Sequence, residues 1–213
     1  MNILEMRYRA LMNKQKSKET ILPKEYQQVE YIKSTGTQYI DTGVLANENN
    51  SYKVKAQLTS AGASSQTVWG GRQNPTSGSN QLSYLKNEGV YQFVCGHSAV
   101  TTNQLKWDTN IHTFYANKNV LYVDEKVVAT ALSGTITSKN NVYLFATNTA
   151  GQIGYNGGSL NIFYCKIWNN DILVRDYIPC YRKADNVAGL YDLVNGVFYT
   201  NTGTGEFNIG AEV

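Results

Sequence analysis

Apolar and polar residues alternate strictly between positions 52 and 58, and this period of two constrains the fold more than any other feature of the chain. The apolar set is Tyr52, Val54, Ala56 and Leu58, and the polar set is Lys53, Lys55 and Gln57. Successive side chains of a strand point to opposite faces of a sheet, so the pattern predicts a strand with one buried face.

Similar short runs, rich in β-branched and aromatic residues, recur along the rest of the chain. They lie at residues 38–44, 67–70, 81–85, 90–95, 112–116, 120–123, 127–131, 142–147, 160–168, 172–178, 189–193 and 196–200. About a dozen strands at intervals of about 8–12 residues, with no helical periodicity between them, predict an all-β sandwich or barrel. Residues 22–213 contain no internal repeat and no compositional break, so we expect one domain there.

Three short polar segments are predicted to be hairpin turns. Asn195-Gly196 has the strongest signal, because this dipeptide suits the positive φ values of a two-residue turn. Asn169-Asn170-Asp171 and Asp124-Glu125-Lys126 are weaker candidates of the same kind.

Residues 1–21 differ from the rest of the chain and are predicted to form a helical arm with a linker. The candidate anchor residues are Ile3, Leu4, Arg7, Tyr8, Leu11 and Met12, whose apolar members follow a helical stripe. Pro23 restricts Leu22 to extended geometry, so the helix should end before it. A lone helix this short is marginal in water, and we expect it to dock on a partner protein. A frayed tail is the alternative.

The net charge of +3 belongs to this arm. The first 21 residues hold five basic and two acidic side chains, a net charge of +3 that equals the net charge of the whole chain. Residues 22–213 are therefore neutral overall. A neutral domain lacks the clustered Lys and Arg of a nucleic-acid-binding face, so we expect no nucleic-acid partner. No apolar run approaches the roughly 18 residues of a membrane span, and we expect neither a membrane segment nor a secretory signal.

Catalytic, metal and cofactor chemistry find little support in the sequence. Paired carboxylates at alternate strand positions, as a glycosidase requires, are missing, and His97 and His112 have no ligands at metal spacing. Asp108 near Asn110 is only a weak calcium candidate, and a structural hydrogen bond is the favoured role of His112. We therefore expect no enzyme activity, no metal and no cofactor.

The three cysteines, Cys95, Cys165 and Cys180, are an odd number in a large domain, so buried thiols are the favoured interpretation. A disulfide between Cys165 and Cys180, which flank a predicted hairpin, is left open.

Carbohydrate binding would need an aromatic face beside amide or charged partners for the sugar hydroxyls. Four groups offer such a combination: Trp69 with Arg72 and Gln73, Tyr84 with Asn87, Trp107 with Asp108, and Tyr155 with Asn156. Trp69 ranks first, because Gly70 and Gly71 beside it could leave its face open. Packing in the core is the alternative for every one of these rings, and it is the favoured role of Trp168.

Several segments together carry a resemblance to a known family. They are Tyr26–Val44, Ile111–Tyr115 with Leu121–Val127, Ile162–Trp168, Leu173–Lys183, Gly189–Gly196 and Gly203–Phe207. They resemble a laminin G-like, concanavalin A-like lectin module common in bacteriophage and prophage structural proteins, over nearly all of residues 22–210. The resemblance implies a two-sheet antiparallel jelly-roll sandwich used as a virion or surface appendage. Glu125 stands where this family usually has Gly, which puts the turn type in doubt.

Together these observations predict a non-enzymatic phage virion protein, made in the host cytoplasm and present as a homo-oligomer within an assembly. Its arm would contact other virion proteins, and its lectin-like domain would adhere to host-surface polysaccharide. One alternative is a purely architectural cementing or spacer subunit that binds only protein. Another is a bacterial surface carbohydrate-binding module.

Overall fold

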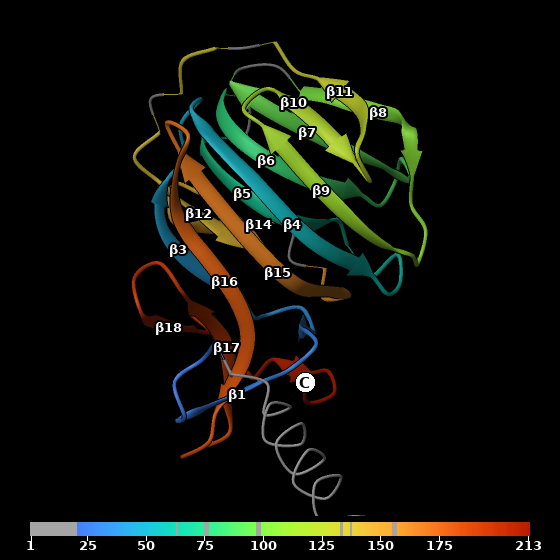
Figure 1. The fold of residues 1–213 in the computed structure, drawn as a ribbon. Coiled ribbons are helices and arrows are strands. Elements are labelled where there is room, and N and C mark those ends of the chain that lie inside the picture. The colour runs from blue at the N-terminus through green and yellow to red at the C-terminus, as the bar shows by residue number, and fades with distance from the viewer. Residues whose placement is uncertain are drawn as a thin grey trace, which may run out of the picture.

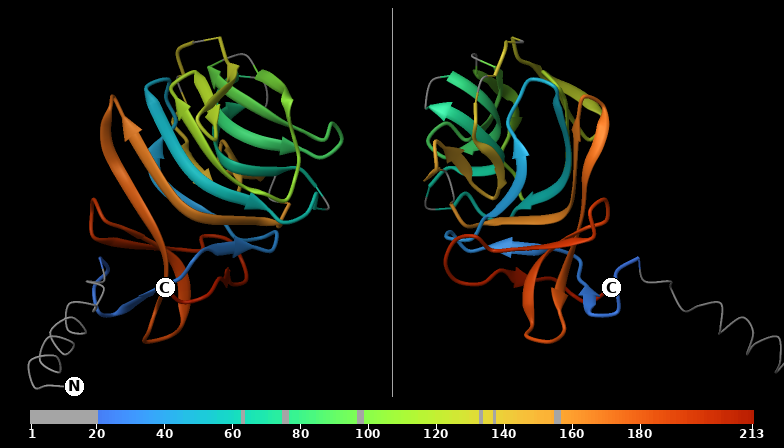
Figure 2. Two further views of the ribbon diagram at one scale, coloured as in Figure 1. Left: turned by 45° about the vertical axis from the view of Figure 1, so that its right-hand side comes forward. Right: turned by 90° about the vertical axis from the view of Figure 1, so that its left-hand side faces the viewer.

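A computed structural model describes residues 21–213, apart from residues 63, 75–76, 97–98, 133, 137 and 155–156. Residues 1–20 of the predicted arm, with the anchor residues Ile3, Leu4, Arg7, Tyr8, Leu11 and Met12, lie outside this described part. Within it the chain forms strands and turns arranged as two antiparallel sheets packed face to face, which confirms the predicted all-β sandwich (Figures 1 and 2).

The front sheet has the strand order β11-β10-β9-β4-β15-β16-β17-β18, with β1, β2 and β19 attached at one end. Its strands are β1 (Tyr26–Gln28), β2 (Ile32–Ser34), β4 (Asn50–Leu58), β9 (Ile111–Asn117), β10 (Val120–Val123), β11 (Lys126–Thr130), β15 (Leu160–Asn169), β16 (Ile172–Arg182), β17 (Val187–Asp192), β18 (Val197–Thr200) and β19 (Asn208–Ile209). The strand β4, where the strict alternation lies, is internal, with β9 on one side and β15 on the other.

The back sheet has the order β14-β13-β5-β6-β7-β8, with β12 and β3 beside it. Its strands are β3 (Ile40–Leu45), β5 (Gln66–Asn74), β6 (Ser77–Leu85), β7 (Val90–Gly96), β8 (Ala99–Lys106), β12 (Asn141–Leu144), β13 (Thr147–Thr149) and β14 (Gln152–Gly154). All described pairings are antiparallel except that of β13 with β5.

The main core lies between the two sheets, and a stacked aromatic pair joins them. The ring of Tyr52 from β4 stacks on that of Trp69 from β5, with centroids 5.1 Å apart and an interplanar angle of 14°. The Tyr52 hydroxyl donates to Oδ1 of Asn50, and the Trp69 indole N–H donates to Oδ1 of Asn80. Both rings therefore bury their apolar bodies while their polar atoms stay hydrogen-bonded.

A second, smaller core lies at the end of the molecule where the described chain begins and the C-terminus lies (Figure 1). Its buried members are Leu22, Cys180 and Tyr191, with Tyr26 and Phe198 packed against them. The ring of Tyr26 lies 4.9 Å from both the Tyr191 and the Phe198 rings. This small core, called the foot below, joins β1 to the β16–β18 meander.

The hairpin predictions have mixed outcomes. Asn170-Asp171 and Asp124-Glu125 each form a two-residue turn in which both residues have positive φ, as a type I′ turn requires. The prediction for Asn195-Gly196 is wrong in detail. Asp192 pairs with Val197, so the loop has four residues and only its last, Gly196, has positive φ. The Asp192 carboxylate shapes this loop by accepting from the Val194 amide and from the Asn195 side chain.

All three cysteines are free and buried, which confirms the favoured interpretation. Cys165 lies opposite Tyr177 in the β15–β16 pair, while Cys180 lies opposite Gly189 in the β16–β17 pair. The two thiols are therefore not cross-strand partners.

Candidate functional site

The outer face of the front sheet carries a row of side chains that crosses four neighbouring strands. Tyr122 on β10 lies opposite Tyr115 on β9, Tyr115 lies opposite Lys53 on β4, and Lys53 lies opposite Lys166 on β15. The neighbours of Lys53 on β4, Tyr52 and Val54, point into the core. The alternation seen in the sequence therefore places this row on the solvent side.

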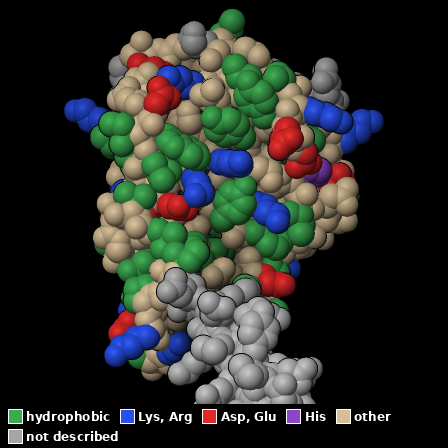
Figure 3. Space-filling model, in the orientation of Figure 1, with side chains coloured by type: hydrophobic (Ala, Val, Ile, Leu, Met, Phe, Trp, Pro, Cys, Tyr) green, Lys and Arg blue, Asp and Glu red, His purple; other side chains and the backbone are tan. Residues whose placement is uncertain are grey.

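The rings of Tyr115 and Tyr122 form an aromatic platform on this face. Their centroids are 5.7 Å apart and their planes differ by 28°, and both side chains are half-buried. Trp168 of β15 meets the Tyr115 ring edge-on at 6.4 Å. Figure 3 shows the face from outside, where hydrophobic side chains gather with Lys and Arg side chains among them.

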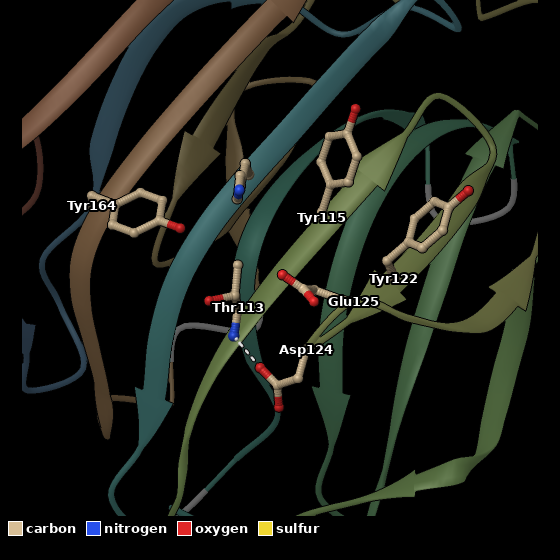
Figure 4. A pocket seen from close by; sticks show the side chains of 7 residues that line it. Thr113, Tyr115, Tyr122, Asp124, Glu125 and Tyr164 are labelled. Carbon is tan, nitrogen blue, oxygen red and sulfur yellow. Dashed lines mark hydrogen bonds between the residues drawn. The ribbon is translucent and has the colours of Figure 1, made fainter.

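A hollow of about 500 Å³ opens beside the platform, and we call it the central hollow. Its lining is Lys53, Thr113, Tyr115, Tyr122, Asp124, Glu125 and Tyr164. Figure 4 shows the Tyr164 ring across β4 from the two platform rings, with Glu125 reaching toward Thr113. The hollow thus combines three phenol rings with charged and hydroxyl groups.

A β-bulge in β15 supplies the Tyr164 side of the central hollow. The register with β4 shifts between Ile162 and Tyr164, so Ile162 and Cys165 both point into the core while Phe163 and Tyr164 are both partly exposed. A bulge re-aims side chains in this way because two residues oppose one on the partner strand. Two consecutive rings therefore reach the outer face.

The acidic rim of the central hollow is held by hydrogen bonds. Oδ1 of Asp124 accepts from the Thr113 amide at 2.9 Å, and its Oδ2 lies 2.6 Å from Nδ1 of His112. The His112 Nε2 lies 2.9 Å from Oδ1 of Asp108. Both ring nitrogens of His112 are engaged, which confirms its predicted structural hydrogen bond.

Lys53 lines the central hollow, with Lys166 opposite it on β15 and Lys55 two residues further along β4. Lys166 pairs with Asp176 at 2.8 Å, and the Lys55 ammonium lies over the Phe163 ring at 5.7 Å from its centroid. Within the described part of the chain, the ammonium group of the exposed Lys53 has no hydrogen-bond or ion-pair partner. Lys53 can therefore donate to a ligand without breaking an existing bond.

The first-ranked sequence candidate, Trp69, does not lie on this face. Its side chain has 0% exposure, and its ring stacks on Tyr52 inside the sandwich, so the expectation of an open face is wrong. A bulge in β5 between Thr67 and Trp69 turns Val68 and Trp69 alike into the core. Gly70 and Gly71 instead accommodate close neighbours, since a Cβ on Gly70 would lie 2.9 Å from Oγ1 of Thr147.

The other sequence candidates are dispersed. Tyr84 is 2% exposed and belongs to the core, so it cannot offer a face to a sugar. Trp107 is partly buried against the core, and Asp108 is engaged by His112. Arg72 donates to Oγ1 of Thr149, Gln73 and Asn87 are exposed, and no platform ring lies beside them. Tyr155 and Asn156 lie outside the described residues.

None of the described sugar-binding candidates chosen from the sequence lines the central hollow. Tyr115 and Tyr122 alternate with buried neighbours on β9 and β10, and this alternation was a usable signal. Trp168 was predicted to be core, but it is partly exposed and contacts the platform ring of Tyr115.

The described residues contain no group of three or more His, Cys, Asp or Glu side chains placed to hold a metal ion. Nor does the described part contain a helix of the length and apolarity that crossing a membrane requires.

Comparisons with known proteins give only distant similarities. No family model matches the chain, and no curated protein matches it. Among solved structures, the chain is similar to the IT-sialidase CBM40 of Ruminococcus gnavus, with 15% identity, a TM-score of 0.48, and coverage of 72% of this chain and 94% of that one. For the same module bound to alpha2,3 sialyllactose, the identity is 13% and the TM-score is 0.43, with coverage of 68% of this chain and 91% of that one. With identities and TM-scores this low, the likeness assigns neither a family nor a ligand to this chain.

Proposed function

We propose that this chain is a non-catalytic glycan-binding protein whose ligand lies in the central hollow. The observation that carries the proposal is the platform of Tyr115 and Tyr122 beside the Lys53 ammonium, which has no partner among the residues that the structure describes. Ring faces stack on the apolar side of a sugar, while ammonium, hydroxyl and carboxylate groups bind its hydroxyls. Both kinds of group converge on one hollow of suitable size.

Asp124 in the central hollow is poorly suited to be the proton donor of glycoside hydrolysis. Hydrolysis needs one carboxyl group that can donate a proton and a second carboxylate that acts as nucleophile or base. Burial acts to raise the pKa of Asp124, but hydrogen bonds from the Thr113 amide and His112 outweigh it and lower the pKa. Asp124 is thereby held as a carboxylate, and Glu125 is the other acidic residue of the lining.

Binding to a glycan array with neutral, sialylated and uronic-acid-containing chains tests the proposal. We expect the protein to be retained on at least one glycan, and Tyr115→Ala to weaken that retention about fivefold, because one aromatic contact is worth on the order of 1 kcal/mol. Tyr143→Ala is the matched control. It removes one ring of another stacked tyrosine pair, Tyr39–Tyr143, which includes β12 beside the back sheet.

Two results would contradict the proposal. One is a protein that binds no glycan on the array. The other is equal retention of Tyr115→Ala and the unmodified protein when both show the same thermal unfolding midpoint.

The biological setting that we propose for this glycan binding rests on the sequence resemblance. It is a phage virion, with a concanavalin A-like jelly roll anchored by the N-terminal arm and used for adhesion to host-surface polysaccharide. A bacterial surface carbohydrate-binding module fits the central hollow equally well. A purely architectural subunit is less well supported, since it gives no role to the platform.

A further inference from the structure

Two more hollows flank the central hollow on the outer face of the front sheet. One, of about 210 Å³, is lined by Ser51, Tyr115, Trp168 and Asp171. The other, of about 550 Å³, includes Lys55, Gln57, Phe163 and Tyr164 in its lining. Tyr115 is shared by the first and the central hollow, and Tyr164 by the central and the second. These shared side chains place the three hollows in one row along the face, and we call this row the outer groove.

The outer groove follows strand β4. The outward positions of this strand contribute in sequence order: Ser51 to the first hollow, Lys53 to the central one, and Lys55 with Gln57 to the last. The six residue-to-residue steps of strand from Ser51 to Gln57 span about 20 Å. A single sugar ring is much shorter than this, so one ring would leave most of the groove empty.

Each hollow repeats the same combination of groups. Trp168 stands beside Ser51 and Asp171 in the first, and the tyrosine platform stands beside Lys53 and Thr113 in the central hollow. Phe163 stands beside Lys55 and Gln57 in the last. A ring next to hydroxyl, amide or charged groups at three successive places matches a ligand that repeats one kind of unit.

The position of the outer groove within the sheet disfavours an extended peptide as its occupant. Peptides commonly bind by adding a strand to a free sheet edge, where backbone groups are unpaired. Here the groove lies over β4, whose backbone is paired with β9 on one side and with β15 on the other. Recognition must therefore come from side chains, which suits a chain of sugars.

We infer that the ligand is an extended glycan chain that lies along β4 and occupies all three hollows of the outer groove. This inference rests on the proposed function. The central hollow then holds one part of the chain, while Trp168 and Phe163 bind the parts on either side.

A chain-length series tests the inference. The probes are size-fractionated oligosaccharides from partial acid hydrolysis of each polysaccharide that retains the full-length protein. Affinity should rise at least tenfold from the shortest fragment to those long enough to cover the groove, and then level off.

Two variants locate the ends of the bound chain. Trp168→Ala and Phe163→Ala should each weaken binding of the long fragments at least threefold and leave the affinity for the shortest fragment within twofold. Tyr143→Ala should change neither. Trp168 and Phe163 are also partly buried, so the thermal unfolding midpoint of each variant is measured to check that the fold is retained. Trp168→Phe keeps an aromatic ring and should restore part of the affinity lost in Trp168→Ala.

The possible failures are distinguishable. Affinity that does not depend on chain length, or folded end variants that bind long fragments normally, would overturn the extended chain and leave glycan binding intact. A protein that binds no polysaccharide would overturn the proposed function and the inference together. The same holds if it binds no polysaccharide but selectively captures peptides from a random library.

Discussion

His112 fixes the acidic rim of the central hollow because its ring bridges two carboxylates from different segments. Burial alone would lower the pKa of the imidazole, but its hydrogen bonds to Asp124 and Asp108, together with their charges, outweigh burial and raise the pKa. The pKa values of Asp108 and Asp124 shift in the opposite direction, downward. Burial acts to raise the pKa of each carboxyl group, and hydrogen bonds from backbone amides and from His112 lower it.

The bridge predicts a pH-dependent stability with a defined sign. The raised pKa of His112 means that its contribution is present in full below about pH 6.5, the ordinary histidine pKa, and is lost as pH rises through the raised value. The lowered pKa values of Asp108 and Asp124 mean that their contribution is lost as pH falls below about 3.9. Urea unfolding from pH 5 to 9 should show a decline for the unmodified protein that His112→Gln lacks.

The difference between the two unfolding curves isolates His112, because every other ionisable group is common to both proteins. Curves for the unmodified protein and His112→Gln that stay parallel from pH 6 to 9 would show that the bridge contributes no pH-dependent stability.

At the residue scale, the sequence shows which side chains can bind a sugar but not which of them face solvent. Trp69 and the pair Phe163–Tyr164 were misjudged or missed for the same physical reason. A bulge in β5 sends two consecutive residues inward, and a bulge in β15 brings two consecutive rings outward. Each bulge interrupts the period of two from which facing is predicted.

At the scale of single elements, the β10–β11 hairpin carries avoidable backbone strain at its tip. Asp124 and Glu125 have φ values of 47° and 69°, in the left-handed region where side chains other than glycine are disfavoured. The doubt about the turn type raised by Glu125 is thereby resolved: the turn forms without glycine. The Asp124 carboxylate compensates by accepting from the Thr113 amide of the neighbouring strand β9.

Replacing Glu125 by Gly should stabilise the protein. The relief of left-handed strain, about 1–2 kcal/mol, exceeds the added entropy of the unfolded chain, about 0.5–1 kcal/mol. We expect a net gain of about 0.5–1 kcal/mol, which raises the thermal midpoint by about 1–4 °C in calorimetry. Glu125→Ala removes the same carboxylate without relieving the strain. A gain of equal size in that control would show that charge, and not backbone strain, is responsible.

The elements themselves were predictable where alternation is strong and were missed where polar residues dominate. Each predicted strand has a counterpart, but the run at 142–147 divides into β12 and β13, because Phe145 adopts a φ of 69° between them. Strand β8, Ala99–Lys106, went unpredicted, since Thr101, Thr102, Asn103 and Gln104 give it no apolar period. Pairing with β7 forms this strand in spite of its composition.

At the scale of the whole molecule, the three cysteines are distributed between two separate cores. Cys165 lies in the main core between the sheets, whereas Cys180 lies in the foot. Burial raises the pKa of the Cys95 thiol to about 11, helped by the charge of Glu48, and raises that of Cys180 to about 12. Burial raises the pKa of Cys165 as well. All three thiols are therefore protonated and unreactive at neutral pH.

Pulsed alkylation in increasing urea should separate the two cores. The foot buries few side chains, so it should open at a lower free energy than the main core. We expect Cys180 to react at lower urea than Cys165, with mass spectrometry of peptides as the measurement. Simultaneous labelling of both cysteines at every urea concentration would show instead that foot and sandwich unfold as one unit.

Along strand β4, even-numbered and odd-numbered residues have different roles from position 51 to position 58. Tyr52, Val54, Ala56 and Leu58 support the core, whereas Ser51, Lys53, Lys55 and Gln57 line the outer groove. Substitutions at the exposed Lys53 should therefore alter the preference for the proposed ligand with little effect on folding. Inserting or deleting one residue would exchange the two sets, burying lysines and exposing the core. Evolution of ligand preference along this strand should thus proceed by replacement and not by change of length.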